Sequence, residues 1–598
     1  MGQFKVHFLP QDVTVTVDEG TSLLDAQIKA QLHPDAPCGG KGTCGKCLVN
    51  ILSGGPAGIQ KACVTEVHED MEVELKAESL KHSILLEGAK RNIVIDPAIK
   101  GYHVAVEKCL IGDSRSDWAR LKEAVSQASG IPAEEIPVSL PVISGLYDYL
   151  LAHNFEADVI MCENEIIDLA DGEKPLYVMA YDIGTTTIVG YLLNARTGRE
   201  LAVSSMLNPQ SQFGADVIQR SNHALAEGVE ELSSCVRKAL NDLAAQAALQ
   251  AGITAEEIYM ITVVGNTCMH HLFAGIMPGA LVHSPYNPSV SESMMLPAAQ
   301  YGIRIHPHGK IMLLPNIAGF VGADTVGVLL ATQFDTLEDL TLVIDIGTNG
   351  EMVLGNKDHM IACSTAAGPA FEGAKIQCGM RGAEGAIDHV HFENNQLVYS
   401  TIGNAKPVGI CGSGLMDIIA ELLKAGIIAS SGRLEKPEAL TGEIGKTNAH
   451  RIEKIDNFLS FVLADERESG TGKKIFLSQK DIREVQLAKS AMAAGILLMS
   501  DTLKIRQEDI KKIMIAGAFG NYMSPDSACA IGLLPQELRD RIEPIGNAAG
   551  EGSKIAALNK KEFHHCNQMA RQTEFLELAT HPDFQDCYVD ELEFPEYK

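Results

Sequence analysis

Apolar and polar residues alternate with a period of two near the N-terminus, over residues 4–8 and again over 13–17. This alternation predicts two strands, each with one buried face. A helix is expected to begin near Thr21, and the segment MEVEL at 71–75 is expected to form a further strand. These elements predict a small sheet-containing module that ends near residue 85.

Two later segments share another pattern, in which an apolar strand ends in Asp and is followed by Ile-Gly-Thr and a second strand. They are LYVMAYDIGTTTIVGYLLN, which contains Asp182, and LTLVIDIGTNGEMVLG, which contains Asp345. Each segment predicts a β-hairpin whose turn presents amides, hydroxyls and one carboxylate at a single point. Such a turn suits the phosphates of a nucleotide, and two turns would hold them from both sides.

The residues of the two turns have separate expected roles. Glycine lets the backbone approach a phosphate, threonine donates hydroxyl hydrogen bonds, and Asp182 and Asp345 can hold Mg2+, mostly through its waters. The predicted phosphate-binding residues are Gly184, Thr185, Thr186 and Thr187 in the first turn, and Gly347, Thr348, Asn349 and Gly350 in the second. Glu351 is a candidate general base for an attacking water, and Glu372 is a similar candidate.

Two further segments complete the predicted nucleotide site. An apolar strand over 513–516 runs into a loop that would admit adenosine, formed by Gly517, Ala518, Phe519 and Gly520. A helix is predicted within residues 409–423, and its first amides can bond phosphate or ribose oxygens; the residues expected to do so are Gly412, Ser413 and Gly414.

The segment RESGTGKK at 467–474 is not a P-loop, because Arg467 and Lys474 occupy positions that require Gly and Ser or Thr. We expect it to be a charged surface loop. The helix that follows is predicted to begin with a capping box made by Ser478 and Asp481.

Four cysteines near the N-terminus follow the spacing C-x5-C-x2-C-x15-C; they are Cys38, Cys44, Cys47 and Cys63. Plant-type [2Fe-2S] ferredoxins have the spacing C-x4-C-x2-C with a distant fourth cysteine, so only the first gap differs, by one residue. The glycine-rich stretch PCGGKGTCGKC gives the backbone freedom to wrap a cluster. Structural zinc is the main alternative, although zinc usually takes two close pairs of ligands. With the alternating strands, the cysteines predict a ferredoxin-like β-grasp module carrying a [2Fe-2S] cluster.

Composition and charge narrow the possible partners. At 598 residues the chain is too long for one core, and hydrophobic residues make up 46% of it. The sequence contains neither a long uncharged apolar run nor a basic, then apolar, N-terminal segment, which leads us to expect a soluble cytoplasmic protein without a membrane partner. A net charge of −28 disfavours nucleic acid as a partner, because phosphate backbones are repelled.

The chain is therefore predicted to be a multidomain α/β protein. The expected units are a [2Fe-2S] ferredoxin-like domain at 1–85, a linker at 86–100, a small α/β middle domain at 101–175, an ATPase lobe at 176–335, a second lobe at 336–560, and a C-terminal tail at 561–598. The acidic end of that tail, DELEFPEYK at 590–598, is expected to be exposed to solvent. Pro97 and Gly101 are expected to break regular structure around the linker. Trp118 is expected to be a packing residue of the middle domain.

The order of two phosphate turns and an adenosine loop resembles the actin, sugar-kinase and Hsp70 ATPase superfamily, whose fold is two similar α/β lobes with ATP in the cleft. Together with the cysteine motif, the chain resembles the reductive activators of corrinoid-dependent enzymes. The resemblance spans nearly the whole chain through YDIGTTT, VVGNTCMHHLFAG, IDIGTNGE, STAAGPAFEGAKI, GICGSGLMD, QLAKSA and IAGAFGNY.

This resemblance implies an activity. The protein would take one electron from a reduced carrier through a [2Fe-2S] cluster and use ATP and Mg2+ to reduce an inactive Co(II) corrinoid protein to Co(I). The partner would be a methyltransferase component or a corrinoid iron-sulfur protein, in an anaerobic metabolism. The family also leads us to expect a homodimer.

Other functions remain open from the sequence. One is an ATP-driven low-potential donor to a non-corrinoid enzyme, and another is a redox subunit whose ATPase has no redox role. A kinase or chaperone would leave the cysteine motif without a purpose, and a dehydratase activator of the same ATPase fold would lack the ferredoxin module. His270 and His271 invite a metal-ligand interpretation, but adjacent side chains point to different faces, so we expect structural roles for them.

Overall fold

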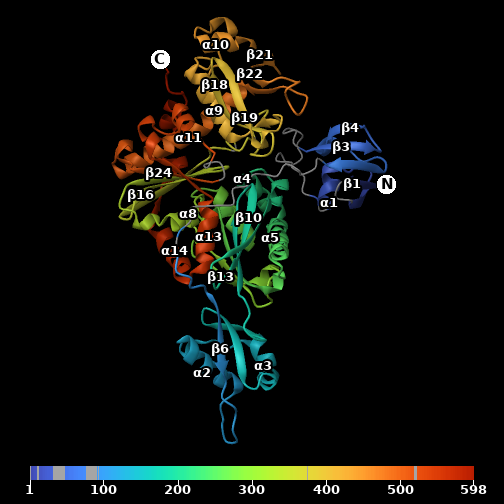
Figure 1. Cartoon of the computed structure of the whole chain (residues 1–598), viewed down its shortest axis with the longest axis vertical. Helices are drawn as coiled ribbons and strands as arrows, with labels where there is room; N and C mark the ends of the chain where they lie inside the picture. The colour runs from blue at the N-terminus through green and yellow to red at the C-terminus, as the bar shows by residue number, and fades with distance from the viewer. Residues whose placement is uncertain are drawn as a thin grey trace.

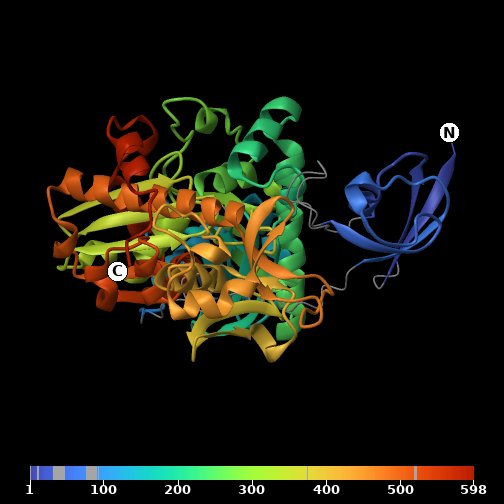
Figure 2. The same cartoon turned by 90° about the horizontal axis from the view of Figure 1, so that it is seen from above.

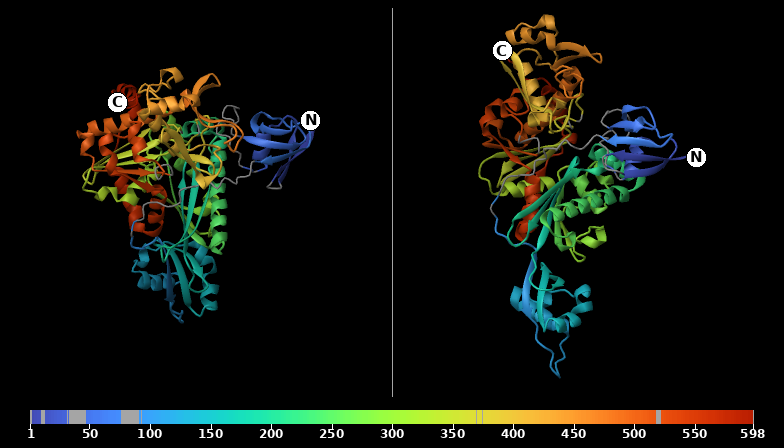
Figure 3. Two further views of the ribbon diagram at one scale, coloured as in Figure 1. Left: turned by 45° about the horizontal axis from the view of Figure 1, so that its top comes forward. Right: turned by 45° about the vertical axis from the view of Figure 1, so that its right-hand side comes forward.

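The computed structural model of the chain describes residues 2–9, 13–30, 32, 47–75, 91, 93–368, 370–373, 375–517 and 522–597. Figure 1 shows a small N-terminal sheet beside a large two-lobed body, with a second small domain at the end of the body opposite α10 (Glu443–Asn448). Figures 2 and 3 show the same separation of the N-terminal sheet from the body in other orientations. No helix among the described residues is long and apolar enough to cross a membrane.

The N-terminal domain contains a five-stranded sheet with the order β2-β1-β5-β3-β4. Its elements are β1 (Gln3–Leu9), β2 (Val13–Asp18), α1 (Leu23–Lys29), β3 (Leu48–Ser53), β4 (Gly58–Lys61) and β5 (Met71–Leu75). The predicted strands at 4–8, 13–17 and 71–75 are confirmed, because Val6, Phe8 and Val17 point into one core. The Ser22 hydroxyl caps α1 by accepting from the amide of Asp25.

The middle domain packs two helices against a three-stranded sheet with the order β6-β7-β8. Its elements are β6 (Ile99–Ala105), α2 (Asp117–Ser129), α3 (Leu140–Ala152), β7 (Glu156–Cys162) and β8 (Glu165–Ala170). Trp118 belongs to the core of this domain, as expected. The expectation that Gly101 breaks regular structure is wrong, because Gly101 lies inside β6 and pairs with Ile160 of β7.

The first lobe contains a six-stranded sheet with the order β11-β10-β9-β12-β14-β13. The strands are β9 (Tyr177–Ile183), β10 (Thr187–Asn194), β11 (Glu200–Leu207), β12 (Ile258–Gly265), β13 (Met294–Pro297) and β14 (Lys310–Leu313). The helices are α4 (Val217–Glu227), α5 (Glu230–Ala251), α6 (Thr267–Ala274), α7 (Gly279–Val282) and α8 (Ala323–Thr332). β9 and β10 form the first predicted hairpin, and β12 runs parallel to β9.

The second lobe repeats this arrangement in a six-stranded sheet with the order β25-β24-β15-β16-β17-β26. The strands are β15 (Thr341–Ile346), β16 (Gly350–Asn356), β17 (His359–Thr365), β24 (Lys512–Ala516), β25 (Ile542–Gly546) and β26 (Thr573–Phe575). β15 and β16 form the second predicted hairpin, and β24 runs parallel to β15 as β12 does to β9. The helix α11 (Gln479–Leu503) begins with the predicted capping box of Ser478 and Asp481.

An inserted region extends the second lobe. It contains β18 (Ala386–Glu393), β19 (Gln396–Thr401), β20 (Gly409–Ile410), α9 (Gly412–Lys424), α10, β21 (Ile452–Ile455), β22 (Phe458–Ala464) and β23 (Ile475–Ser478). The helices α12 (Pro525–Ala530), α13 (Ala548–Leu558), α14 (Lys560–Gln572) and α15 (Phe584–Asp590) follow later in the chain. Figure 1 shows α8 and α13 between the two sheets, where both contribute to a core shared by the lobes.

The expectation that the acidic end of the chain is exposed to solvent holds only in part, because Asp590, Glu593 and Glu596 are exposed but Phe594 is buried. The segment 561–597 as a whole is folded onto the second lobe. The segment forms α14, adds β26 to the edge of the second sheet beside β17, and places α15 against α11. Near the end of the chain, Phe594 is buried and Lys489 of α11 donates a hydrogen bond to the carbonyl of Glu593 at 2.6 Å. The apolar residues of this segment are too widely spaced among acidic ones for their burial to be predicted.

Candidate functional site

The two predicted phosphate turns meet in one cleft between the lobes. Thr186, in the turn between β9 and β10, and Thr348, in the turn between β15 and β16, have hydroxyl oxygens 3.4 Å apart. The cleft has a volume of about 280 Å3. The predicted residues that line it are Asp182, Gly184, Thr185, Thr186, Thr187, Asp345, Gly347, Thr348, Asn349, Glu351, Glu372, Gly412, Ser413 and Gly517.

Some predicted residues have other positions. Gly350 lies in β16 and Gly414 in α9, and neither lines the cleft. At Gly414 any side chain would meet the carbonyl oxygen of Ile387 at 2.2 Å, so this glycine allows α9 to pack closely on β18. Ala518, Phe519 and Gly520, together with Cys38 and Cys44, lie outside the described residues.

The first turn is supported by polar side chains from three other elements. Arg220 of α4 donates to the carbonyl of Thr185 at 2.6 Å, and Asn208 donates to the carbonyl of Gly184 at 2.8 Å. Asn266, at the start of α6, donates to the hydroxyl of Thr185 at 2.9 Å. Asn266 also lines the cleft. These contacts fix the carbonyls so that the turn presents its amides and hydroxyls to the cleft.

The second turn is closed by a hydrogen bond from the amide of Gly347 to the carbonyl of Asn349, at 2.9 Å. Gly517 follows β24 with a φ of +90°, and a side chain at this position would meet the carboxylate of Asp345 at 2.7 Å. Glycine is therefore required at 517 both by its backbone angle and by its contact with Asp345.

Buried acidic residues dominate the charge of the cleft. Burial raises the pKa of Asp182 to about 7, with repulsion from Asp324 adding to the effect. Burial also raises the pKa of Asp345 to about 7 and that of Asp324 to about 6. The pKa of Glu351 is raised well above its usual range, again by burial first and then by Asp324 and Asp345. Acids held together in this way favour a bound cation.

The same acids fit Mg2+ held through water rather than a closed protein cage. Among the described residues, no group of three histidine, cysteine or acidic side chains is close enough together to hold a metal directly. Mg2+ usually keeps several waters and binds through one or two carboxylates and the phosphates of a substrate. The acid at position 324, at the start of α8, has no special motif around it and was not predicted.

Two more residues of the cleft were missed by the sequence analysis. Asn547 caps α13 by accepting from the amide of Gly550 at 2.9 Å, and its amide group hydrogen-bonds Asp182, which opposes the rise in that residue's pKa. Arg381 is the one basic side chain among the described residues that line the cleft. A cationic side chain in this position is suited to contact phosphate oxygens.

The glutamates and histidines named from the sequence differ in position. Glu351 pairs across the hairpin with Asp345, and Glu372 accepts hydrogen bonds from both Thr186 and Thr348. His270 and His271 are buried in α6 and do not line the cleft. His271 donates from Nδ1 to the carbonyl of Thr267 and accepts at Nε2 from the amide of Ser289, so its contacts are structural.

The described part of the cysteine motif brings two thiols together. Cys47 lies just before β3, and Cys63 lies just after β4. The carbonyl of Cys47 accepts a hydrogen bond from the amide of Ala62 at 2.7 Å. Burial raises the pKa of the Cys47 thiol, and Cys63 acts on it through hydrogen bonds and charge. Two interacting thiols, one just before β3 and one just after β4, fit ligands of a shared cluster better than they fit isolated core cysteines.

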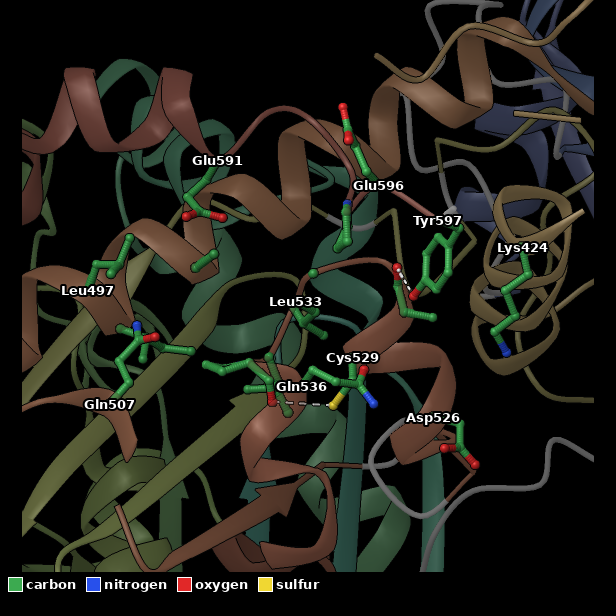
Figure 4. Close-up of a pocket in the computed structure, with 17 residues that line it drawn as sticks. Lys424, Leu497, Gln507, Asp526, Cys529, Leu533, Gln536, Glu591, Glu596 and Tyr597 are labelled. Carbon is green, nitrogen blue, oxygen red and sulfur yellow. Dashed lines mark hydrogen bonds between the residues drawn. The ribbon is translucent and has the colours of Figure 1, made fainter. Parts of the chain in front are cut away.

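A larger cavity of about 500 Å3 lies elsewhere, between α11, α12 and the C-terminal segment. Figure 4 shows Lys424, Asp526, Glu591 and Glu596 around it, with Cys529 and Leu533 in its wall. Acidic side chains line it, but none of its described lining residues belongs to a predicted phosphate turn. Size alone therefore does not identify the nucleotide site, and the chemistry of its lining favours the cleft between the lobes.

Comparison with known proteins gives consistent matches along the chain. Family models match residues 6–78 as a 2Fe-2S iron-sulfur cluster binding domain, 88–175 as the RACo linker region, 177–337 as the RACo middle region, and 339–598 as the C-terminal ASKHA domain of RACo. A corrinoid activation enzyme of Eubacterium limosum, RamQ, is 37% identical over 97% of both chains.

Two further matches have similar titles. A Co(II) methylated amine-specific corrinoid protein reductase of Methanosarcina barkeri is 24% identical over 70% of this chain and 77% of its own length. A solved structure of a reductive activator for corrinoid, iron-sulfur protein has a TM-score of 0.77 and 33% identity, over 99% of this chain and 98% of that one.

The fold and the cleft define a two-lobed, actin-like ATPase joined to a 2Fe-2S domain. Within that class, the chain belongs to the RACo family of corrinoid activators.

Proposed function

We propose that this protein is an ATP-dependent reductive activator that transfers one electron to a corrinoid protein and converts its inactive Co(II) to Co(I). The observation that carries the proposal is the meeting of two phosphate turns at Thr186 and Thr348, in a chain that also contains a 2Fe-2S domain. The relatives named as a corrinoid activation enzyme and a Co(II) corrinoid protein reductase support the choice of acceptor.

The need for ATP follows from the energetics of the electron transfer. For a one-electron step, each ~59 mV by which the donor falls short lowers the equilibrium constant tenfold. ATP binding and hydrolysis can offset this deficit if the lobes hold the Co(II) partner in one state and release the Co(I) product in the other. The shared core of α8 and α13 provides the contact through which the two lobes would move together.

The residues of the cleft have the following roles in this proposal. The amides and hydroxyls of the two turns bind the phosphates, while Asp182, Asp324 and Asp345 hold Mg2+ through its waters. The ion supplies positive charge to the phosphates. Gly412 and Ser413 present the first amides of α9 to ribose or phosphate oxygens, and Glu351 orients the attacking water.

The proposal extends to the partners and the cluster. Cys38, Cys44, Cys47 and Cys63 would hold a [2Fe-2S] cluster, which accepts and gives up one electron at a time. A reduced electron carrier would supply the electron, and the acceptor would be a methyltransferase component or a corrinoid iron-sulfur protein. We place the protein in the cytoplasm, where ATP is available, and expect a homodimer.

The test is anaerobic visible spectroscopy of a Co(II) corrinoid protein mixed with this protein and a low-potential reductant. We expect a Co(I) band that appears only with Mg-ATP and that is lost in Cys47→Ala and in Asp345→Asn. Cys109→Ala is the matched control, because this exposed cysteine of the small middle domain lies outside the motif. If ATP is hydrolysed but no corrinoid partner is reduced, the acceptor is a different low-potential enzyme.

A further inference from the structure

One carboxylate oxygen joins the two phosphate turns across the cleft. The Oε2 atom of Glu372 accepts a hydrogen bond from the hydroxyl of Thr186 at 3.2 Å and another from the hydroxyl of Thr348 at 3.2 Å. Thr186 belongs to the first lobe and Thr348 to the second. Glu372 itself follows β17, so a side chain from outside both turns connects them.

This oxygen has the chemistry of a phosphate oxygen. Ionised carboxylates, like phosphates, present anionic oxygens that accept hydrogen bonds from hydroxyls, and such charge-assisted bonds are stronger than neutral ones. In the proposed complex, the hydroxyls of Thr186 and Thr348 would donate hydrogen bonds to the terminal phosphate from the two sides of the cleft. Glu372 and a terminal phosphate therefore compete for the same pair of donors.

The electrostatics of the cleft make joint occupancy unfavourable. Glu372 is close enough to Asp345 to raise the pKa of that residue by charge repulsion, after burial and after Asp324 and Asp182. A nucleoside triphosphate brings further negative charge to the same place, and like charges at such distances repel strongly in a partly buried site. The carboxylate must move away when the phosphate arrives.

The segment that carries Glu372 has backbone features suited to such a movement. Gly368 and Gly373 flank it with φ values of +74° and +73°, which only glycine adopts without strain. The side chain of Glu372 is half-buried rather than locked in the core, while its neighbour Phe371 is buried and anchors the segment.

We propose that Glu372 is an internal substitute for the terminal phosphate, which joins the two lobes while the cleft is empty and is displaced when a nucleoside triphosphate binds. The inference rests on the proposed binding of ATP in this cleft. Glu372 should therefore weaken the binding of ATP but not of ADP, because ADP lacks the terminal phosphate that competes with the carboxylate. The lobes would thus remain connected in both states, through Glu372 in one and through the phosphate in the other.

The test compares triphosphate and diphosphate binding by calorimetry, using the full-length protein with Mg2+ and either the non-hydrolysable analogue AMPPNP or ADP. In Glu372→Gln and Glu372→Ala we expect the dissociation constant for AMPPNP to fall about tenfold, which corresponds to about 1.4 kcal/mol. The constant for ADP is expected to change less than twofold. Two variants are used because the glutamine keeps the shape of the side chain and removes only its charge.

Asp388→Asn is the matched control, since Asp388 lines the same cleft but pairs with Ser400 and not with the turns. An equal gain in this variant would show general charge repulsion and would overturn the inference. So would unchanged AMPPNP affinity with loss of ATP hydrolysis, which would make Glu372 a general base, or equal changes for both nucleotides. If the unaltered protein binds neither nucleotide, the proposed function itself is wrong. Failure of the proposed function is thus distinguished from failure of the Glu372 inference, in which nucleotide binds but Glu372 does not compete with it.

Discussion

The guanidinium of Arg220 donates a hydrogen bond to the main-chain carbonyl of Thr185 at 2.6 Å, directly behind the first phosphate turn. Arg220 is buried, and it also donates to the carbonyl of Gly214 at 3.0 Å. Burial lowers its pKa to about 10, so the side chain remains charged at neutral pH. A fixed positive charge thus lies under a turn that is built to receive phosphate, and it holds the shape of that turn at the same time.

Replacing Arg220 should therefore weaken both the fold and nucleotide binding. In Arg220→Gln, two carbonyls lose their donor, and we expect the free energy of unfolding to fall by about 2–4 kcal/mol. We also expect the dissociation constant for ADP to rise about tenfold, as measured by calorimetry. Arg237→Gln serves as the control, because Arg237 donates to the carbonyl of Phe273 in the same lobe without contacting the turn. Equal losses of ADP affinity in the two variants would contradict this role.

The two hairpins and the cysteine motif could be predicted because their information is local. Asp182 and Asp345 each end an apolar strand, and the glycine and threonines that follow them fix the turn. Arg220, Asp324 and Asn547 could not be found in this way. Their segments have the pattern of ordinary helices or helix starts. Only the packing of α4, α8 and α13 brings Asp324 and Asn547 into the cleft and Arg220 behind its first turn.

The acid missed by the sequence analysis should govern the response to Mg2+. Asp324 raises the pKa values of Asp182, Asp345 and Glu351, which shows that these acids share one electrostatic site. Asp324→Asn keeps an oxygen for the amide of Thr325 but removes the charge. We expect the Mg2+ concentration that gives half-maximal ATP hydrolysis to rise about tenfold or more.

The Mg2+ dependence of Asp388→Asn is the comparison for this experiment, since Asp388 contributes the same charge to the lining of the cleft. A rise of similar size in both variants would mean that the site responds to total charge only. An unchanged Mg2+ requirement in Asp324→Asn would exclude Asp324 from the ion site.

His270 predicts a loss of stability in acid. Both ring nitrogens of His270 are buried without a hydrogen-bond partner among the described residues, and burial lowers its pKa to about 3. The unfolded chain would protonate this histidine below a pH of about 6.5, whereas the folded chain would not. The contribution of His270 to the free energy of unfolding is therefore fully present above pH 6.5 and is lost progressively as the pH falls toward 3.

Between pH 7.5 and 5.5 this residue should cost about 1.4 kcal/mol of unfolding free energy. In His270→Phe, urea denaturation should show that much less change between the two pH values. His283→Phe is the control, because His283 is exposed and should keep the full pH dependence of the unaltered protein. An identical pH dependence in all three proteins would mean that His270 is not the buried neutral group described.

The last prediction concerns the acidic end of the chain, residues 590–598, which the sequence predicts to be exposed to solvent. Phe594 is 3% exposed and belongs to the core of the second lobe, and its amide donates to the carbonyl of Ser430 at 2.7 Å. Removing a buried phenylalanine side chain costs about 3–5 kcal/mol, so Phe594→Ala should lower the melting temperature of the second lobe by several degrees. Glu596→Ala, two residues away and exposed, should change it little. If both variants melt like the unaltered protein, Phe594 does not pack against the second lobe, and the whole acidic end would be exposed as the sequence predicts.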